Sequence, residues 1–154
     1  MPVKNAMLLR LRRQEGVSMV EFALVAPLLF VLLFGIIEFG IILYDQAVIT
    51  NASRDGARYL TQFPANSSAP PTDADVTTYV QTYVANRVIS FSPSAPVPTV
   101  SFPAAQAGYS AVEVAYPYQF LVFGGLISLL HGVVPNQLQL TATTAMQNEN
   151  TPLN

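Results

Sequence analysis

The sequence contains no cysteine and a single histidine, His131. The lack of cysteine excludes a disulfide framework, a thiolate metal site and a cysteine nucleophile. No cluster of carboxylates surrounds His131 in the sequence, so neither a histidine-based metal site nor a Ser-His-Asp arrangement is visible. A glycine-rich phosphate-binding loop is also missing. We therefore expect no catalytic residue, no metal, no cofactor and no enzymatic activity.

Charged residues are scarce as well. They make up 10% of the chain, whereas soluble globular proteins average about 25%. The formal net charge of −2, without a clustered basic face, argues against nucleic acid as a partner. At 154 residues the chain is long enough for one well-buried domain. Its excess of apolar residues indicates a lipid bilayer as a partner.

One long apolar run dominates the sequence. It covers residues 22–44, FALVAPLLFVLLFGIIEFGIILY, and its only charge is Glu38, which we expect near the outer interface. As a helix, these 23 residues extend roughly 35 Å, enough to span a membrane. A buried core helix and a secretory signal peptide are the competing interpretations. However, the run has no polar stripe before Glu38, and a signal peptide has an apolar region of only about 7 to 15 residues. Pro27 predicts a kink.

Basic residues gather before the apolar run. Four of the seven Lys and Arg residues lie within the first 13 positions. By the positive-inside rule, this asymmetry predicts a cytoplasmic N-terminus and an outward-facing C-terminal part. We therefore expect a basic cytoplasmic leader at residues 1–16, a membrane helix with its extramembrane continuation at residues 17–60, and an outer domain at residues 61–154.

A glycine and a carboxylate mark the start of the apolar run. Gly16 is followed by Val17, and Glu21-Phe22 come five and six residues after Gly16. An ionised glutamate in a lipid-embedded helix is costly, so Glu21 needs a cation or water nearby. If a peptidase cuts after Gly16, Val17 becomes a free amine, and a neighbouring subunit's amine could pair with Glu21 and set the axial stagger between subunits. The competing interpretation is that Glu21 snorkels to the cytoplasmic headgroups.

The basic leader, Gly16, Glu21-Phe22 and the apolar helix together resemble the processing motif of Flp and Tad-type prepilins. Residues 37–40 (IEFG) and 50–59 (TNASRDGARY) are similar to TadE-like proteins specifically. The resemblance covers residues 10–60. It implies a minor pseudopilin of the bacterial tight-adherence secretion machinery, needed for assembling adhesive Flp pili. It also implies a cut between Gly16 and Val17, with Glu21 and Phe22 serving processing or subunit alignment.

The resemblance further implies partners and a location. The partners are a prepilin peptidase, other Tad pilins and pseudopilins, and the inner-membrane Tad assembly platform. The protein would be a single-pass protein of the bacterial inner membrane, with its C-terminal domain periplasmic or extracellular. A TadF-like role, and a position inside the pilus or outside it, stay open. The alternative function is a single-pass, membrane-anchored periplasmic binding module or enzyme that uses the same anchor.

The membrane helix is expected to continue over residues 45–60. Apolar residues recur there at helical spacing, at Val48, Ala52 and Tyr59, and Asp55 can pair with Arg58. A turn at Asp55-Gly56 is the alternative, because glycine costs about 1 kcal/mol inside a helix. If the helix continues, its small residues would let another element pack close: Ala52, Gly56 and Ala57.

A second helix is predicted over residues 72–91, after an exposed loop at residues 64–71. Thr72 and Asp75 resemble a capping box, and acids at a helix N-terminus explain Asp73 and Asp75 better than a cation loop does. We assign the tyrosines of the apolar stripe to core packing, the alternative being a ligand platform. The stripe consists of Val76, Tyr79, Val80, Tyr83, Val84, Val88 and Phe91.

Three strands are predicted, at residues 97–102, 109–116 and 137–146. The last two alternate, which predicts that one face is buried; its residues are Val112, Val114, Tyr116, Leu138, Leu140, Ala142 and Met146. The apolar residues 120–130 are too few to cross a bilayer and are expected to pack on the sheet or at the membrane surface. The predicted fold class is α+β: a long N-terminal membrane-spanning helix extending into a small domain with one packed helix and a three-stranded antiparallel sheet.

Overall fold

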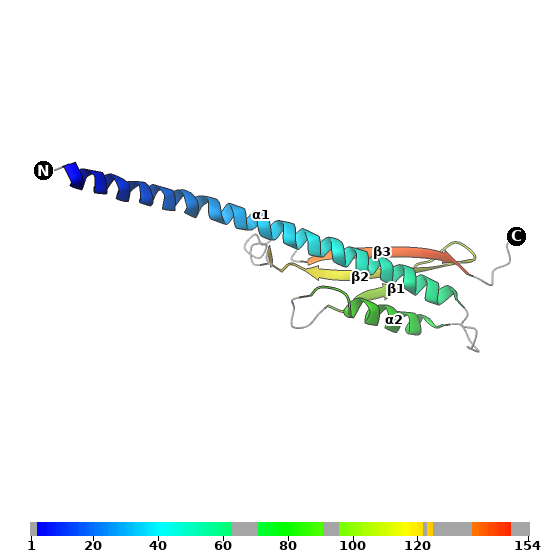
Figure 1. Ribbon diagram of the computed structural model, residues 1–154. Helices are drawn as coiled ribbons and strands as arrows, with labels where there is room; N and C mark the ends of the chain where they lie inside the picture. The colour runs from blue at the N-terminus through cyan, green and yellow to red at the C-terminus, as the bar shows by residue number, and fades with distance from the viewer. Residues whose placement is uncertain (1–2, 63–70, 91–95, 122, 125–136, 149–154) are drawn as a thin grey trace. The chain divides into compact units, whose positions relative to one another are not determined.

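The computed structural model describes residues 3–62, 71–90, 96–121, 123–124 and 137–148, with side chains from residue 16 onward. Its elements are α1 (Val3–Thr61), α2 (Asp73–Ala85), β1 (Thr99–Ser101), β2 (Tyr109–Gln119) and β3 (Gln137–Gln147). The strands form one antiparallel sheet in the order β1-β2-β3 (Figure 1). The predicted α+β class, with a long N-terminal helix, one further helix and three antiparallel strands, is confirmed. The chain divides into two compact units, Met1–Ile37 and Glu38–Asn154.

The first unit is the N-terminal part of α1. Its described side chains are largely exposed and apolar; Phe22, for example, is 70% exposed. Among the described residues, α1 is the one helix long and apolar enough to cross a membrane, and its most apolar stretch is not buried. Pro27 lies inside α1 without ending it. Residues 22–44 are therefore helical throughout, and the kink at Pro27 stays a prediction.

In the second unit, β2 is the central strand of the sheet. All 11 of its residues pair with β3, from Tyr109 opposite Gln147 to Gln119 opposite Gln137. Only three residues of β2 pair with β1, which is shorter than the predicted strand at residues 97–102. β1 begins at Thr99, opposite Ala115, so it does not pair with Pro117. On that side β2 is an edge strand at Pro117, where a residue without an N–H is tolerated. This explains why β2 continues beyond the predicted end at residue 116.

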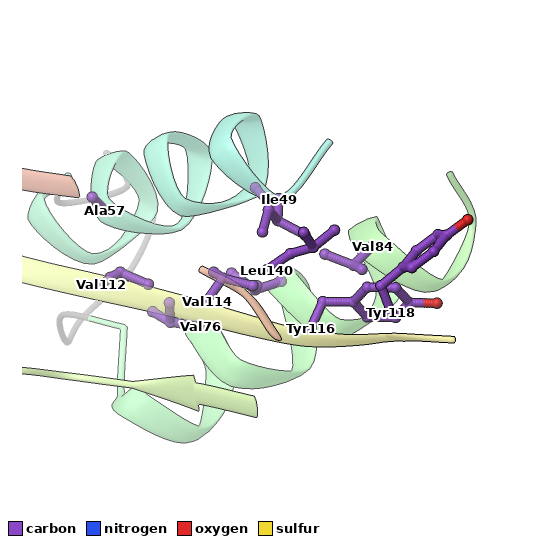
Figure 2. Packing of buried hydrophobic residues seen from close by; sticks show 11 residues of the cluster. Ile49, Ala57, Val76, Val84, Val112, Val114, Tyr116, Tyr118 and Leu140 are labelled. Atoms are coloured by element: carbon purple, nitrogen blue, oxygen red, sulfur yellow. The ribbon is translucent and has the colours of Figure 1, made fainter. Parts of the chain in front are cut away.

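The buried hydrophobic residues of the described segments form one core between one face of the sheet and the two helices (Figure 2). Burying a valine or isoleucine side chain contributes about 1.5–3 kcal/mol, so this cluster supplies much of the domain's stability. The predicted inward face of β2 is confirmed, whereas Leu138 of β3 is exposed. The buried residues are Ile49, Ala52 and Ala57 of α1, Val76, Val80 and Val84 of α2, Val112, Val114, Tyr116 and Tyr118 of β2, and Leu140 of β3.

Small residues let α1 approach α2 and the sheet closely. A Cβ atom built on Gly56 would lie 2.7 Å from Val80 Cγ2 and 3.4 Å from Val112 Cγ1. The neighbouring Ser53 hydroxyl donates a hydrogen bond of 2.8 Å to the Val112 carbonyl. The predicted close packing is thus confirmed. Because the helix runs unbroken through Gly56, the alternative of a turn there is wrong.

The predicted continuation of α1 over residues 45–60 is confirmed, but the expected pair between Asp55 and Arg58 is wrong. Val48 and Ala52 are buried, but Tyr59 is 36% exposed. Tyr59 lies on the last turns of α1, where its ring stacks on Tyr79 of α2 instead of entering the core. The expected pair between Asp55 and Arg58 does not form among the described residues, in keeping with the small gain from ion pairs at a surface.

The N-terminus of α2 is capped as predicted. The Asp75 N–H donates to the Thr72 hydroxyl and the Thr72 N–H donates to the Asp75 carboxylate, at 3.3 and 2.9 Å. The Thr72 hydroxyl also donates to the Asp75 carboxylate, at 2.7 Å, and this bond together with the one from the Thr72 N–H lowers the pKa of Asp75. The helix ends at Ala85, earlier than the predicted residue 91, because the chain turns after Asn86 and the Val88 N–H still reaches the Val84 carbonyl.

The assignment of the α2 tyrosines to the core is wrong for Tyr79, which is 42% exposed. The fully buried stripe consists of Val76, Val80 and Val84, and Tyr83 is half-buried beside it. The close approach of α1 at Gly56 leaves room for valines but not for a tyrosine ring. Phe91, His131 and most of the segments 64–71 and 120–130 lie outside the described residues.

Candidate functional site

The expected processing motif lies on the exposed surface of α1. Gly16, Val17, Glu21 and Phe22 are all helical and exposed. Apart from the backbone of its own helix, no described heavy atom lies within 4 Å of a Cβ built on Gly16, so packing against the described part of the chain does not require glycine there. The glycine is therefore available as a recognition feature for another protein.

Glu21 makes no hydrogen bond or ion pair with another residue whose side chain is described. It belongs to a surface of exposed apolar side chains, among them Val17, Val20 and Phe22. Such a surface suits lipid tails or the helices of other subunits. A carboxylate in that environment needs a partner from outside the described part of the chain.

The carboxylate inside the apolar run, Glu38, is only 3% exposed. The Tyr118 hydroxyl and the Leu121 N–H both donate to Glu38 Oε1, each at 2.7 Å. Burial, the hydrogen bond to Glu38 and the negative charge of Glu38 raise the pKa of Tyr118 well above its usual range. Glu38 thus ties the start of the second unit to the end of strand β2.

A third acid, Asp45, is fully buried. The Ile89 N–H donates to its Oδ1 at 3.0 Å, while Oδ2 has no hydrogen-bond partner. Burial raises the pKa of Asp45, and the Ile89 hydrogen bond opposes that rise. The nearby Tyr116 hydrogen-bonds the Ser90 side chain, and its pKa is raised by burial and by the charge of Asp45.

These buried acids were not identified as a group from the sequence. Glu38 and Asp45 are seven residues apart, which places them on one face of a helix two turns apart. Tyr116 and Tyr118 are two apart, which places them on one face of a strand. The spacing on each element was visible, but the pairing of Glu38 with Tyr118, 80 positions later, follows only from the fold.

None of these groups forms a metal centre. Within the described residues, no cluster of three or more His, Asp or Glu side chains could hold a metal ion. The buried carboxylates accept hydrogen bonds from groups of the same unit: Glu38 connects α1 to the end of β2, and Asp45 connects α1 to the segment after α2.

The fold and the apolar helix define the class: an α+β protein in which one helix, among the described residues, is long and apolar enough to anchor the chain in a membrane. Comparison with known proteins then specifies the relationship. The family model of TadE-like proteins matches residues 16–58, so the resemblance to TadE-like proteins is confirmed for that segment. No curated protein and no solved structure matches the chain. The TadE-like segment indicates involvement in the Tad/Flp pilus system.

Proposed function

We propose that the protein is a minor pseudopilin that takes part in assembling Flp-type, tight-adherence pili, and that a prepilin peptidase cuts it between Gly16 and Val17. The observation that carries this proposal is the TadE-like match over residues 16–58. The matched segment starts at the glycine before the proposed cut. It also contains Glu21, the residue proposed for processing or subunit alignment.

The surroundings of Glu21 give the proposal a physical basis. In a bundle of packed membrane helices, a carboxylate with no cation facing it costs several kcal/mol. The free amine of Val17 from a neighbouring processed subunit is a suitable cation, whereas an uncut chain has a neutral peptide bond at that position. Cleavage would therefore create the partner that Glu21 lacks within the described chain. Phe22, exposed beside it, would pack against the neighbouring helix.

The proposed location follows from the charge distribution. The basic residues of the leader, Lys4, Arg10, Arg12 and Arg13, favour a cytoplasmic N-terminus at the bacterial inner membrane. The sheet domain would then be periplasmic or extracellular. In this arrangement the partners are the prepilin peptidase, other Tad pilins and pseudopilins, and the Tad assembly platform.

The test is co-expression of the full chain with and without a prepilin peptidase, followed by sequencing of the N-terminus. With the peptidase we expect a mature chain that begins at Val17; without it we expect the full-length chain. A full-length product under both conditions would contradict the proposal and favour a membrane-anchored binding module or enzyme, which needs no cut.

Two variants and one control sharpen this test. Gly16→Ala should reduce cleavage, while the matched variant Gly40→Ala should be cut as the parent is. Both glycines lie on α1 with no neighbour within 4 Å of a built Cβ, so the two substitutions differ mainly in position. Glu21→Gln separates the two roles left open. An uncut Glu21→Gln chain assigns the residue to processing, and a cut chain that fails to enter a pilin complex assigns it to alignment.

A further inference from the structure

Three tyrosines form a row on the surface of the second unit, at the outer end of α1. The Tyr59 and Tyr79 rings are stacked with centroids 5.3 Å apart, and Tyr79 and Tyr83 follow with centroids 6.5 Å apart at a tilt of 42°. The valine stripe of α2 fills the core, Tyr83 packs against its edge, and Tyr59 and Tyr79 stay exposed. Part of the apolar surface of these rings is therefore exposed to water, and a ligand that covers it would be favoured.

Beside the tyrosines lies an open groove of about 390 Å³. This volume falls within the range of about 300–1,000 Å³ typical of small-ligand sites. Its lining combines two aromatic rings with four polar side chains from α1, α2 and the turn after α2: Asp55, Tyr79, Thr82, Tyr83, Asn86 and Arg87.

The polar groups of the groove are arranged for neutral, hydrogen-bonding ligands. Arg87 lies with its guanidinium carbon 3.9 Å from the centre of the Tyr83 ring and donates one hydrogen bond of 3.2 Å to the Tyr83 carbonyl. A guanidinium has five N–H donors, so others remain for a ligand. Asp55 makes no hydrogen bond or ion pair with a described residue, and its carboxylate offers acceptors only. One positive and one negative side chain balance each other.

We propose that this groove, defined by Asp55, Tyr79, Thr82, Tyr83, Asn86 and Arg87, binds a saccharide. A sugar ring has an apolar C–H face that packs on an aromatic ring, and a rim of hydroxyls that both donate and accept hydrogen bonds. Tyr79, which lines the groove and is 42% exposed, supplies the first contact. Asp55 accepts from hydroxyls, Arg87 donates to them, and Asn86 does both. The shallow, open shape of the groove suits a ligand that stays partly hydrated.

Other ligand classes fit the groove less well. A quaternary ammonium ion would use the tyrosine faces, but Arg87 already covers Tyr83 and repels a cation. A phosphate group would be repelled by Asp55. A proline-rich peptide also packs on tyrosines, but it has few N–H groups to donate to the Asp55 carboxylate. Lipid headgroups are a poor match because Tyr59 lies 21 residues beyond Glu38, roughly 30 Å along the helix.

The test measures binding of oligosaccharides to the full-length protein in a detergent without a sugar headgroup, since an alkyl maltoside would compete. Tyrosine fluorescence and calorimetry are suitable because the chain has seven tyrosines and no tryptophan. The probes are chitotetraose, cellotetraose and maltotetraose, which separate a preference for N-acetylated cell-wall sugars from one for neutral polysaccharides. We expect saturable binding of at least one of them.

Matched variants locate the site. Tyr79→Ala should weaken binding about tenfold, as expected for losing one aromatic stacking contact, while Tyr79→Phe should retain it. Tyr109→Ala removes another exposed tyrosine outside the groove and should bind as the parent does. Asp55→Asn should weaken binding without lowering the unfolding temperature. Lack of binding to all three sugars, equal binding by Tyr79→Ala, or preferential binding of choline or a proline-rich peptide would each overturn the proposal.

Discussion

The contact at Gly56 gives the sharpest test of the packing between α1 and α2. In Gly56→Ala, the new methyl would lie 2.7 Å from Val80 Cγ2, well inside van der Waals contact. Val80 has little room to move, because a valine in a helix has one strongly preferred rotamer and this one is fully buried. Overpacking a well-packed core costs about 1–3 kcal/mol.

The substitution also has a favourable effect that must be subtracted. Alanine is better than glycine inside a helix by about 1 kcal/mol. With the overpacking cost near the upper end of its range, we expect Gly56→Ala to lower the free energy of unfolding by about 2 kcal/mol. For a domain of this size the melting temperature should fall by about 8 °C. The melting temperature is measured by thermal unfolding of the full chain in detergent, monitored by the near-ultraviolet circular dichroism of the tyrosines.

Two controls determine whether the contact is the cause. Gly40→Ala places the same substitution on α1 where nothing lies within 4 Å of the built Cβ, so it should be neutral or stabilising. The double variant Gly56→Ala/Val80→Ala should be more stable than the sum of its single variants predicts, because the new methyl occupies space that the valine vacates. If the two effects simply add, or if Gly56→Ala melts as the parent does, the reasoning is refuted.

Two further predictions concern the buried acids. Tyr118→Phe removes a hydroxyl that donates to the buried Glu38 carboxylate and should cost about 2 kcal/mol in chemical denaturation, whereas Tyr109→Phe, at an exposed site, should cost nearly nothing. For Asp45, burial raises the pKa above 3.8, so its contribution to stability is fully present below that pH and is lost as the pH rises through the folded-state pKa. The stability of the parent relative to Asp45→Asn should therefore fall as the pH rises above the ordinary pKa of an aspartate, and a difference that stays constant across the pH titration would contradict the assignment.

The elements of the second unit were predictable because their signals are local. Thr72 and Asp75 form a capping box within four residues, and the alternation of β2 follows from the period of a strand. The long N-terminal helix was predictable from the length of the apolar run alone. These features depend on neighbouring residues, so no knowledge of the tertiary structure was required.

The environment of individual side chains was less predictable. Helical spacing puts Tyr79 on the same broad apolar stripe as Val76 and Val80, and only the narrow gap at Gly56 determines that the valines enter the core while Tyr79 remains at the surface. The Glu38–Tyr118 contact joins residues 80 positions apart. Such pairings arise from the register of the sheet and the position of α1 on it, which no local pattern specifies.

Glu21, just before the apolar run, and Glu38, inside it, differ in a way that bears on function. Each would be costly in a membrane if it were ionised and alone. Glu38 is buried in the second unit, and its hydrogen-bond partners there are Tyr118 and Leu121. Glu21 is exposed and has no such bond among the described residues. Of these two glutamates, Glu21 is the one without a hydrogen-bond partner among the described residues, and under the proposed function a processed neighbouring subunit would supply it.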